Sequence, residues 1–457
     1  MRLLRNPALT GFTFLLLIAS APSIAQQSAD PHAAQSPQQV ATNQNGQPLQ
    51  VTLADALARA KKLSPTLANA LAQSKLAADA AIQARAAVLP NVTGISQYLY
   101  TEGNGTLAAR FIANNGVHEY IAQADVHQAI SGPLFFQYRR ATLLKAIAHD
   151  QFTIAQRGLL VTVVQAYSNY YGAQGKLATA EETLDSAQNF LKTTQERQKN
   201  GDAAYADVLK ARIQADDIES AVSNASMVLE QSRIALALLI FEDVNQLYEL
   251  VDDPSKALSL PPREDAQAHA SVSNPELDAA ERNSKAADKD LTAARLAYLP
   301  SLTFDYFYGI DANQFATEFT LPNGRVAQNL GYSALGSLTM PIFTWGSTWS
   351  KVRDAKSLKQ SAQTNLAFAR RKAIGDFETF YDEAQVAAHD LKVREAAYDD
   401  AVQSRKLTLL QYSAGAATAL EVVTAESAVD TESGALYDAK TRFATAVANL
   451  ATLTGRL

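Results

Sequence analysis

An internal repeat is the feature that most constrains how this chain can fold. In each half, the proline of a Pro-x-Leu motif lies 25 positions before the proline of a Leu-Pro pair. Three short anchors recur in the same order, and the matching segments are 64–67 with 274–277, 89–90 with 299–300, and 200–211 with 414–425. Such a repeat indicates two copies of one structural unit. We place these copies at 51–250 and 265–457.

Two strands of alternating polarity are expected in each half, directly after the Leu-Pro pair. From Leu302 to Ile310, apolar and aromatic side chains occupy every second position. Alternation of this kind predicts a strand with two unlike faces. The four strands are expected at about 91–101, 118–131, 301–311 and 329–340. Their length of about ten residues also suits a tilted strand that crosses a membrane.

Two very long helices are expected, because proline is missing from two long stretches. No proline lies between Pro133 and Pro254 or after Pro341. Helices could therefore run from about 134 to 200 and from about 343 to 412, each about 100 Å long at ~1.5 Å per residue. A coiled-coil seam supports the first helix, and its members are Leu177, Ala180, Leu184, Ala187 and Leu191. Its continuity through glycines 158, 172 and 175 stays open at this point.

The first 50 residues have the pattern of an export signal and a leader. Arg2 and Arg5 precede an apolar run that ends in small residues, so we expect a signal peptide at 1–25. An uncleaved anchor is the alternative. The segment 26–50, rich in Gln, Ala, Ser and Pro, is expected to be a flexible leader. The connector between the copies is placed at 251–264, and the stretch 252–275, which contains four prolines, is expected to hold little regular structure.

Composition excludes several classes of function. The formal net charge of −6 argues against a nucleic-acid binder. With no cysteine, the chain has no disulfides, thiol catalysis or Cys-based metal sites. The six histidines have no metal-ligand spacing, and we find no catalytic constellation. We therefore expect neither enzymatic activity nor a cofactor, and we expect the acidic residues on solvated helix faces.

Four strands leave two architectures open. Known single-chain barrels start at about eight strands, and an open sheet edge is not tolerated in lipid. Either several copies pool their strands into one barrel, or the strands form a soluble sheet. The first alternative describes an outer membrane duct. The second describes a periplasmic coiled-coil scaffold with a soluble sheet cap.

The combined motifs resemble the TolC-type outer membrane efflux proteins. The resemblance covers about 51–455 and rests on four features. They are the duplicated Pro-x-Leu, the Leu-Pro before the first strand of each half, the Gly-(x5)-Asp/Glu-Val-(x2)-Ala turn, and Met340-Pro341-Ile342-Phe343 with Gly346 before the second long helix.

This resemblance implies a fold, a function and a set of partners. The fold is mainly α with membrane β, in which an internally duplicated helical coiled-coil barrel joins a 12-stranded β-barrel built by a homotrimer. The function is an exit duct in the outer membrane of a Gram-negative bacterium, extending into the periplasm. Its partners are a periplasmic adaptor protein, an inner-membrane pump of the RND, ABC or MFS class, and outer membrane lipid.

The resemblance also assigns roles at the periplasmic tip. Glu421, with Thr424 at the second position, corresponds to an acidic pore constriction, while Asp207 and Tyr412 correspond to a latch that closes the tip. The latch lacks its cationic partner, because Ala417 occupies that position. The turns expected to dock the adaptor contain Gly201, Asp202, Ala203, Gly415, Ala416 and Ala417.

In the barrel, the two faces of the strands receive different roles. The side chains expected to face lipid or the aromatic girdle are Phe304, Tyr306, Tyr308 and Tyr332. Those expected to face the lumen are Gln123, Asp125 and Asp305.

Overall fold

The computed structural model describes residues 48–101 and 118–455. The predicted signal peptide and nearly all of the predicted leader lie outside these residues. The helices are α1 (Leu53–Leu63), α2 (Pro65–Ala86), α3 (Gly132–Lys199), α4 (Tyr205–Ile240), α5 (Pro254–Ala257), α6 (Arg263–Val272), α7 (Pro275–Leu296), α8 (Ser347–Ser413) and α9 (Ala419–Thr454). The strands are β1 (Leu49–Val51), β2 (Asn91–Tyr100), β3 (His118–Ile130), β4 (Tyr248–Leu250), β5 (Ser301–Ala312), β6 (Glu318–Thr320), β7 (Val326–Gln328) and β8 (Leu330–Thr339).

The sequence repeat appears as a repeat of elements. The order α2-β2-β3-α3-α4 recurs as α7-β5-β8-α8-α9, with the hairpin β6–β7 inserted before β8. Local chemistry starts each copy at the same place. The side chain of Ser64 accepts a hydrogen bond from Leu67 N at 3.2 Å, and Asn274 accepts one from Leu277 N at 3.1 Å. A proline follows each cap, at the position where its missing N–H costs nothing.

The four long strands form one antiparallel sheet in the order β2-β3-β5-β8. Directly opposite residues share a face, and Tyr308 pairs with Tyr332 while Asp125 pairs with Phe307. The aromatic residues expected to face lipid therefore lie on one face, and Gln123, Asp125 and Asp305 lie on the other. Among the described strands, β2 and β8 are the two edges of this sheet.

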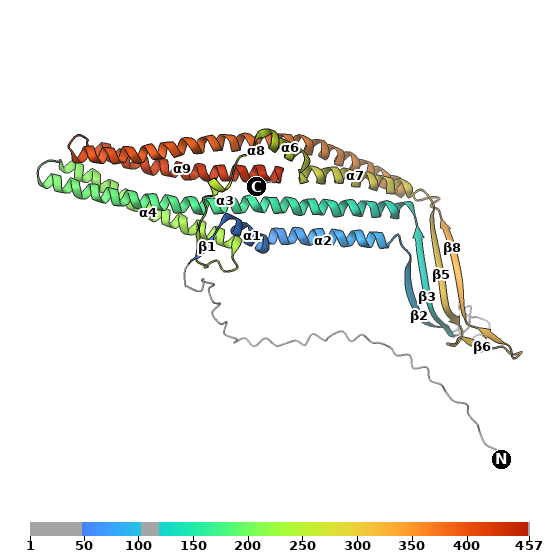
Figure 1. Cartoon of the computed structure of the whole chain (residues 1–457). Coiled ribbons are helices and arrows are strands. Elements are labelled where there is room, and N and C mark those ends of the chain that lie inside the picture. Colours follow the sequence, from blue (N-terminus) through green and yellow to red (C-terminus); the bar gives the residue numbers. More distant parts are fainter. Residues whose placement is uncertain (1–47, 102–117, 456–457) are drawn as a thin grey trace, which may run out of the picture. The chain divides into compact units, whose positions relative to one another are not determined.

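The long helices pack side by side in two sets (Figure 1). Next to the sheet, successive neighbours are α2, α3, α7 and α8; toward the helical turns they are α4, α3, α9 and α8. The two longest helices, α3 and α8, take part in both sets. A buried cluster including Tyr167, Leu236, Ile240 and Val447 lies where the two sets meet. Burial of apolar area there supplies most of the force that holds the helices together.

Helix α3 is continuous through glycines 158, 172 and 175. A close approach favours glycine at position 175, because a Cβ atom there would lie 1.9 Å from Cζ of Tyr437 on α9, whose ring would have to move. Gly158 has open space around it. Ala180 and Ala187 are buried along the expected seam. The sequence left this continuity open, and packing against α9 explains why one of the glycines is tolerated.

The expectation of little regular structure across 252–275 is wrong. Helix α5 and the whole of α6 lie there. Pro254 occupies the first turn of α5, and Pro262 is the N-cap of α6. A proline is well accommodated at a helix start, so these prolines begin helices instead of preventing them.

No helix in the described part of the chain combines the length and the apolar character needed to cross a membrane.

Candidate functional site at the helical turns

Two glycine turns reverse the chain at the far ends of α3 and α8. Gly201 and Gly415 have φ angles of 83° and 77°, a conformation that glycine adopts without steric cost. Around Gly201, Asp202 N donates to Arg197 O at 2.8 Å. The equivalent bond at the second turn runs from Ala416 N to Gln411 O, also at 2.8 Å. Both turns therefore have the Schellman pattern of helix termination, and the predicted docking residues lie in them.

Glu421 is part of a capping box at the start of α9. Its carboxylate accepts hydrogen bonds from Thr418 N at 2.6 Å and Thr418 Oγ1 at 2.9 Å. In return, Glu421 N donates to Thr418 Oγ1 at 3.3 Å. The main-chain and side-chain bonds from Thr418 lower the pKa of Glu421, so its charged form is favoured. Thr424 lies one turn further and donates to Leu420 O at 2.8 Å. The Thr-x-x-Glu pattern was a readable signal for this cap.

Asp207 and Tyr412, the two predicted latch residues, have separate partners within one chain. Asp207 occupies the third position of α4, as Glu421 does in α9, and Lys210 Nζ lies 3.4 Å from its Oδ1. The hydroxyl of Tyr412 lies 3.0 Å from Oγ1 of Thr194. Thr194 already donates to Phe190 O at 2.8 Å, so Tyr412 is the donor of this pair. A latch between these two residues in neighbouring copies stays a prediction.

Tyr412, near the end of α8, contacts residues near the end of α3 and so connects the helix ends that precede the two turns. It is buried, and its ring packs edge-to-face against that of Phe190, with the centroids 4.9 Å apart and an angle of 67° between the ring planes. The guanidinium of Arg197 lies over the Tyr412 ring, 4.8 Å from its centroid, and also donates to Tyr412 O. A cation is therefore present at this tip although Ala417 is not one. Sequence reasoning missed Arg197, Thr194 and Phe190, because nothing near them in the chain points to α8.

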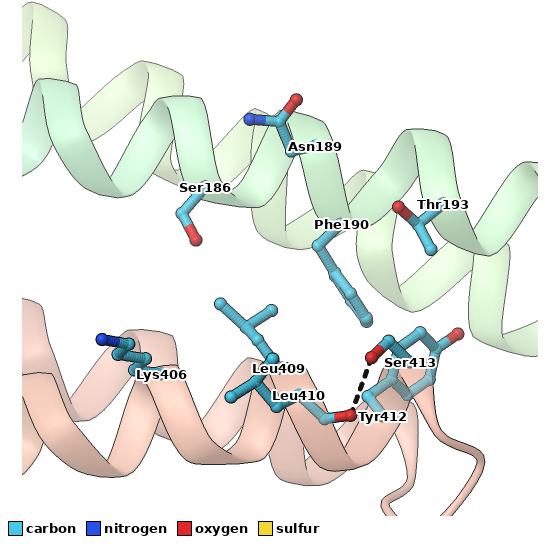
Figure 2. Close-up of a pocket in the computed structure, with 9 residues that line it drawn as sticks. All are labelled: Ser186, Asn189, Phe190, Thr193, Lys406, Leu409, Leu410, Tyr412 and Ser413. Atoms are coloured by element: carbon cyan, nitrogen blue, oxygen red, sulfur yellow. Dashed lines mark hydrogen bonds between the residues drawn. The ribbon is translucent and has the colours of Figure 1, made fainter.

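A groove of about 450 Å³ lies between α3 and α8 just before the turns. Figure 2 shows Phe190 and Leu409 directed from the two helices toward the space between them. The other lining residues are Ser186, Asn189, Thr193, Lys406, Leu410, Tyr412 and Ser413. The lining combines the apolar side chains of Phe190, Leu409 and Leu410 with polar ones, among them the exposed cation of Lys406.

A buried charge cluster lies further along the same helices. Glu426 on α9 is 0% exposed, contrary to the expectation that acidic residues lie on solvated faces. It accepts a hydrogen bond from Ser186 on α3, and Arg405 Nη1 on α8 lies 3.9 Å from its Oε2. Arg405 also pairs with Glu182 on α3. Burial raises the pKa of Glu426. The cluster ties three helices together, which explains how the carboxylate is retained inside.

The polar face of the sheet carries the predicted lumen residues. His127 Nδ1 lies 2.5 Å from Asp305 Oδ1 across β3 and β5. A Cβ atom on Gly309 would lie 2.4 Å from Cα of Gln123, so the two strands approach closely at this point. No group of three or more potential metal ligands occurs among the residues that the structure describes.

Comparisons with known proteins agree with this architecture. A family model for "Outer membrane efflux protein" matches residues 56–240 and 268–456. The outer membrane protein TolC of Vibrio cholerae is 23% identical over 378 residues, covering 82% of this chain and 83% of TolC. The alkaline protease secretion protein AprF of Pseudomonas aeruginosa is 23% identical over 380 residues, covering 80% of this chain and 76% of AprF.

A solved structure shows the same fold. The outer membrane channel CmeC of Campylobacter jejuni superposes with a TM-score of 0.73 at 17% identity, covering 88% of this chain and 85% of CmeC. The predicted TolC-type fold is confirmed at the level of one chain. Since the family model matches both repeats and most of their length, the chain belongs to the outer membrane efflux protein family, and its location is the outer membrane.

Proposed function

We propose that three copies of this chain form an exit duct that carries substrates across the periplasm and the outer membrane. The observation that carries the proposal is the order of elements across the chain. The two edge strands of the sheet are β2 and β8. Helix α8, which follows β8, is the outermost helix of both helix sets. Because β2 and β8 run antiparallel, β8 of one copy can pair with β2 of the next in the same sense as every other pair.

In this duct, the helical turns form the periplasmic tip. A periplasmic adaptor docks on the turns around Gly201 and Gly415 and links the duct to an inner-membrane pump of the RND, ABC or MFS class. Glu421 is fully exposed and its charged form is favoured. Three copies of Glu421 around a common axis would attract cations and repel anions at the tip. Thr424 contributes no charge, so the constriction is weaker than one with two acids in each chain.

Cysteine cross-linking tests the ring, because the chain contains no native cysteine. Thr93→Cys on β2 is combined in turn with Ser333→Cys and Ser337→Cys on β8, all on the polar face of the sheet. Outer membranes are oxidised and separated under denaturing conditions. A ladder of covalent dimers and trimers is expected from at least one pair. The control is Thr303→Cys with Ser337→Cys, which are directly opposite within one chain and should give monomers only.

If no β2–β8 pair cross-links, the native mass of the protein in mild detergent distinguishes the trimeric duct from the soluble scaffold. A detergent-bound trimer keeps the duct and rejects only the tested registers. A monomer released from cells without detergent would replace the duct by a soluble sheet and the alternative scaffold role. The family relationship favours the first outcome.

A further inference from the structure

All four connections between long helices and long strands lie at one end of the sheet (Figure 1). Strands β2 and β5 begin there, after α2 and α7; strands β3 and β8 end there, before α3 and α8. Each junction has an exposed apolar side chain, and an arginine lies four residues away on the helix side. The pairs, with the exposed fraction of the apolar residue, are Arg85 with Leu89 (51%), Arg139 with Phe135 (44%), Arg295 with Leu299 (58%), and Arg353 with Trp349 (59%).

The four arginines are exposed, and none forms an ion pair with another described residue. The neighbouring Arg140 shows the contrast, because its Nε lies 2.7 Å from Asp290 Oδ2. Two of the four are held in place by their aromatic partners. Arg139 lies 4.7 Å from the centre of the Phe135 ring, and Arg353 lies 4.5 Å from that of Trp349. The geometry thus fixes unpaired guanidinium groups beside exposed rings.

The order of groups along the helices matches the order of layers at a membrane surface. Within α3 and α8 a spacing of four residues is about one helical turn, so Arg139 and Arg353 lie roughly 5–6 Å further from the sheet than their aromatic partners. Arg85 and Arg295 lie in the last turns of α2 and α7, while Leu89 and Leu299 lie beyond the ends of these helices, toward the sheet. Aromatic rings prefer the boundary of the hydrocarbon, and long basic side chains reach from it into the headgroup layer. Arginine binds phosphate through two parallel hydrogen bonds.

The segment between β8 and α8 adds exposed apolar side chains at one of these four junctions. Trp345 and Phe343 are 89% and 71% exposed, and their ring centroids lie 4.7 Å apart. Trp345 has a φ of 51°, the one positive value among the described residues other than glycine. Such a conformation costs free energy for a bulky residue. The backbone therefore holds a large apolar ring in the open at this junction.

We propose that the four arginines form a collar that binds the phosphate groups of phospholipids in the periplasmic leaflet of the outer membrane. The adjoining apolar side chains enter the boundary between headgroups and acyl chains. This proposal rests on the proposed function, because it places the sheet in the membrane. The collar fixes the depth of the sheet and prevents the helices from being drawn into the lipid.

The test uses a double variant that carries both Arg139→Gln and Arg353→Gln. This variant is compared with the wild-type trimer. The matched control is Arg212→Gln with Arg371→Gln, which removes the same charge from exposed positions of α4 and α8, away from the sheet. The readouts are the phospholipid phosphorus retained per chain after purification in mild detergent and the increase in unfolding temperature on adding phosphatidylglycerol. Inorganic phosphate at equal phosphorus concentration serves as the comparison for free anions.

The double variant should lose most of the retained phospholipid and bind phosphatidylglycerol about fivefold more weakly for each arginine removed. The control variant should behave as wild type, and inorganic phosphate should give no shift. A further double variant, Arg139→Lys with Arg353→Lys, keeps both positive charges and should retain most of the lipid binding. Equal lipid retention in the double variant and wild type would overturn the collar. Loss of the trimer together with the lipid would also overturn it, because the arginines would then serve contacts between copies. A monomer that needs no detergent would instead remove the proposed function itself.

Discussion

Arg197 on α3 stacks on the ring of Tyr412 on α8, and its guanidinium donates to the carbonyl oxygen of the same residue. This single side chain joins the ends of both halves of the repeat. The two residues are 215 positions apart in the chain. Their contact fixes one helical hairpin against the other at the end that we assign to the adaptor.

Replacing Arg197 with Ala should loosen the tip. The change removes a cation–π contact and a charged hydrogen bond, and the expected cost is about 1–2 kcal/mol. In planar bilayers the resting conductance should rise, and cells should become more sensitive to large antibiotics. Lys199→Ala is the matched control, because Lys199 is exposed at the same end of α3 and makes no ion pair within the described residues. Unchanged conductance in Arg197→Ala would show that this contact does not restrain the tip.

The Asp207 latch between copies can be separated from contacts within one chain. Inside one chain, Asp207 contacts Lys210 at 3.4 Å, a partly exposed pair that contributes little stability. Asp207→Asn should therefore leave the unfolding temperature nearly unchanged while it increases antibiotic entry. Lys210→Gln breaks the same pair from the other side and should not increase entry. If both variants behave alike, Asp207 has no role between copies.

Substitution by alanine should have opposite effects on the free energy of unfolding at Gly175 and at Gly158, because the space around the two glycines differs. Gly175→Ala places a methyl group against the Tyr437 ring and should lower the free energy of unfolding by about 1–3 kcal/mol. Gly158→Ala meets nothing within 4 Å and should raise it by about 0.5–1 kcal/mol. Tyr437→Ala should partly rescue the first variant. Thermal unfolding in detergent measures all three, and a stable Gly175→Ala protein would contradict the close approach.

Glu426 predicts a pH dependence of stability. Burial raises the pKa of Glu426 above its ordinary value of 4.5, so the folded chain holds this proton more tightly than the unfolded chain. The contribution of Glu426 to stability therefore falls as the pH rises from about the ordinary carboxyl value through the raised one. Glu426→Gln should unfold at a higher temperature than wild type at pH 7, and the difference should shrink toward pH 4.5. A difference that grows on acidification would reverse the sign and reject the argument.

The parts of the fold that were predictable depend on local chemistry. Ser64-Pro65 and Asn274-Pro275 start helices through their own side chains, and strict alternation assigned Tyr306 and Asp305 to opposite faces. The prolines at 254 and 262 were misread because the same residue both breaks and begins helices.

The parts that were not predictable depend on distant residues. The partner of Tyr412 is Thr194, 218 positions earlier. Glu426 looks like any charged residue of a helix until α3 and α8 cover it. The proposed roles of Asp207 and Glu421 depend on contacts between copies of the chain. A single sequence does not show which residues of neighbouring copies come together.

The open edges at β2 and β8 have a consequence for biogenesis. Among the described strands, neither β2 nor β8 has a neighbouring strand on its outer side, and hydrocarbon offers no partner to backbone N–H and C=O groups at such an edge. A lone chain therefore has no stable state inside the bilayer. In the proposed trimer, membrane insertion and subunit assembly must occur as one coupled event. In this trimer, a chain that does not meet its neighbours would stay outside the bilayer, because its sheet edges have no partner there.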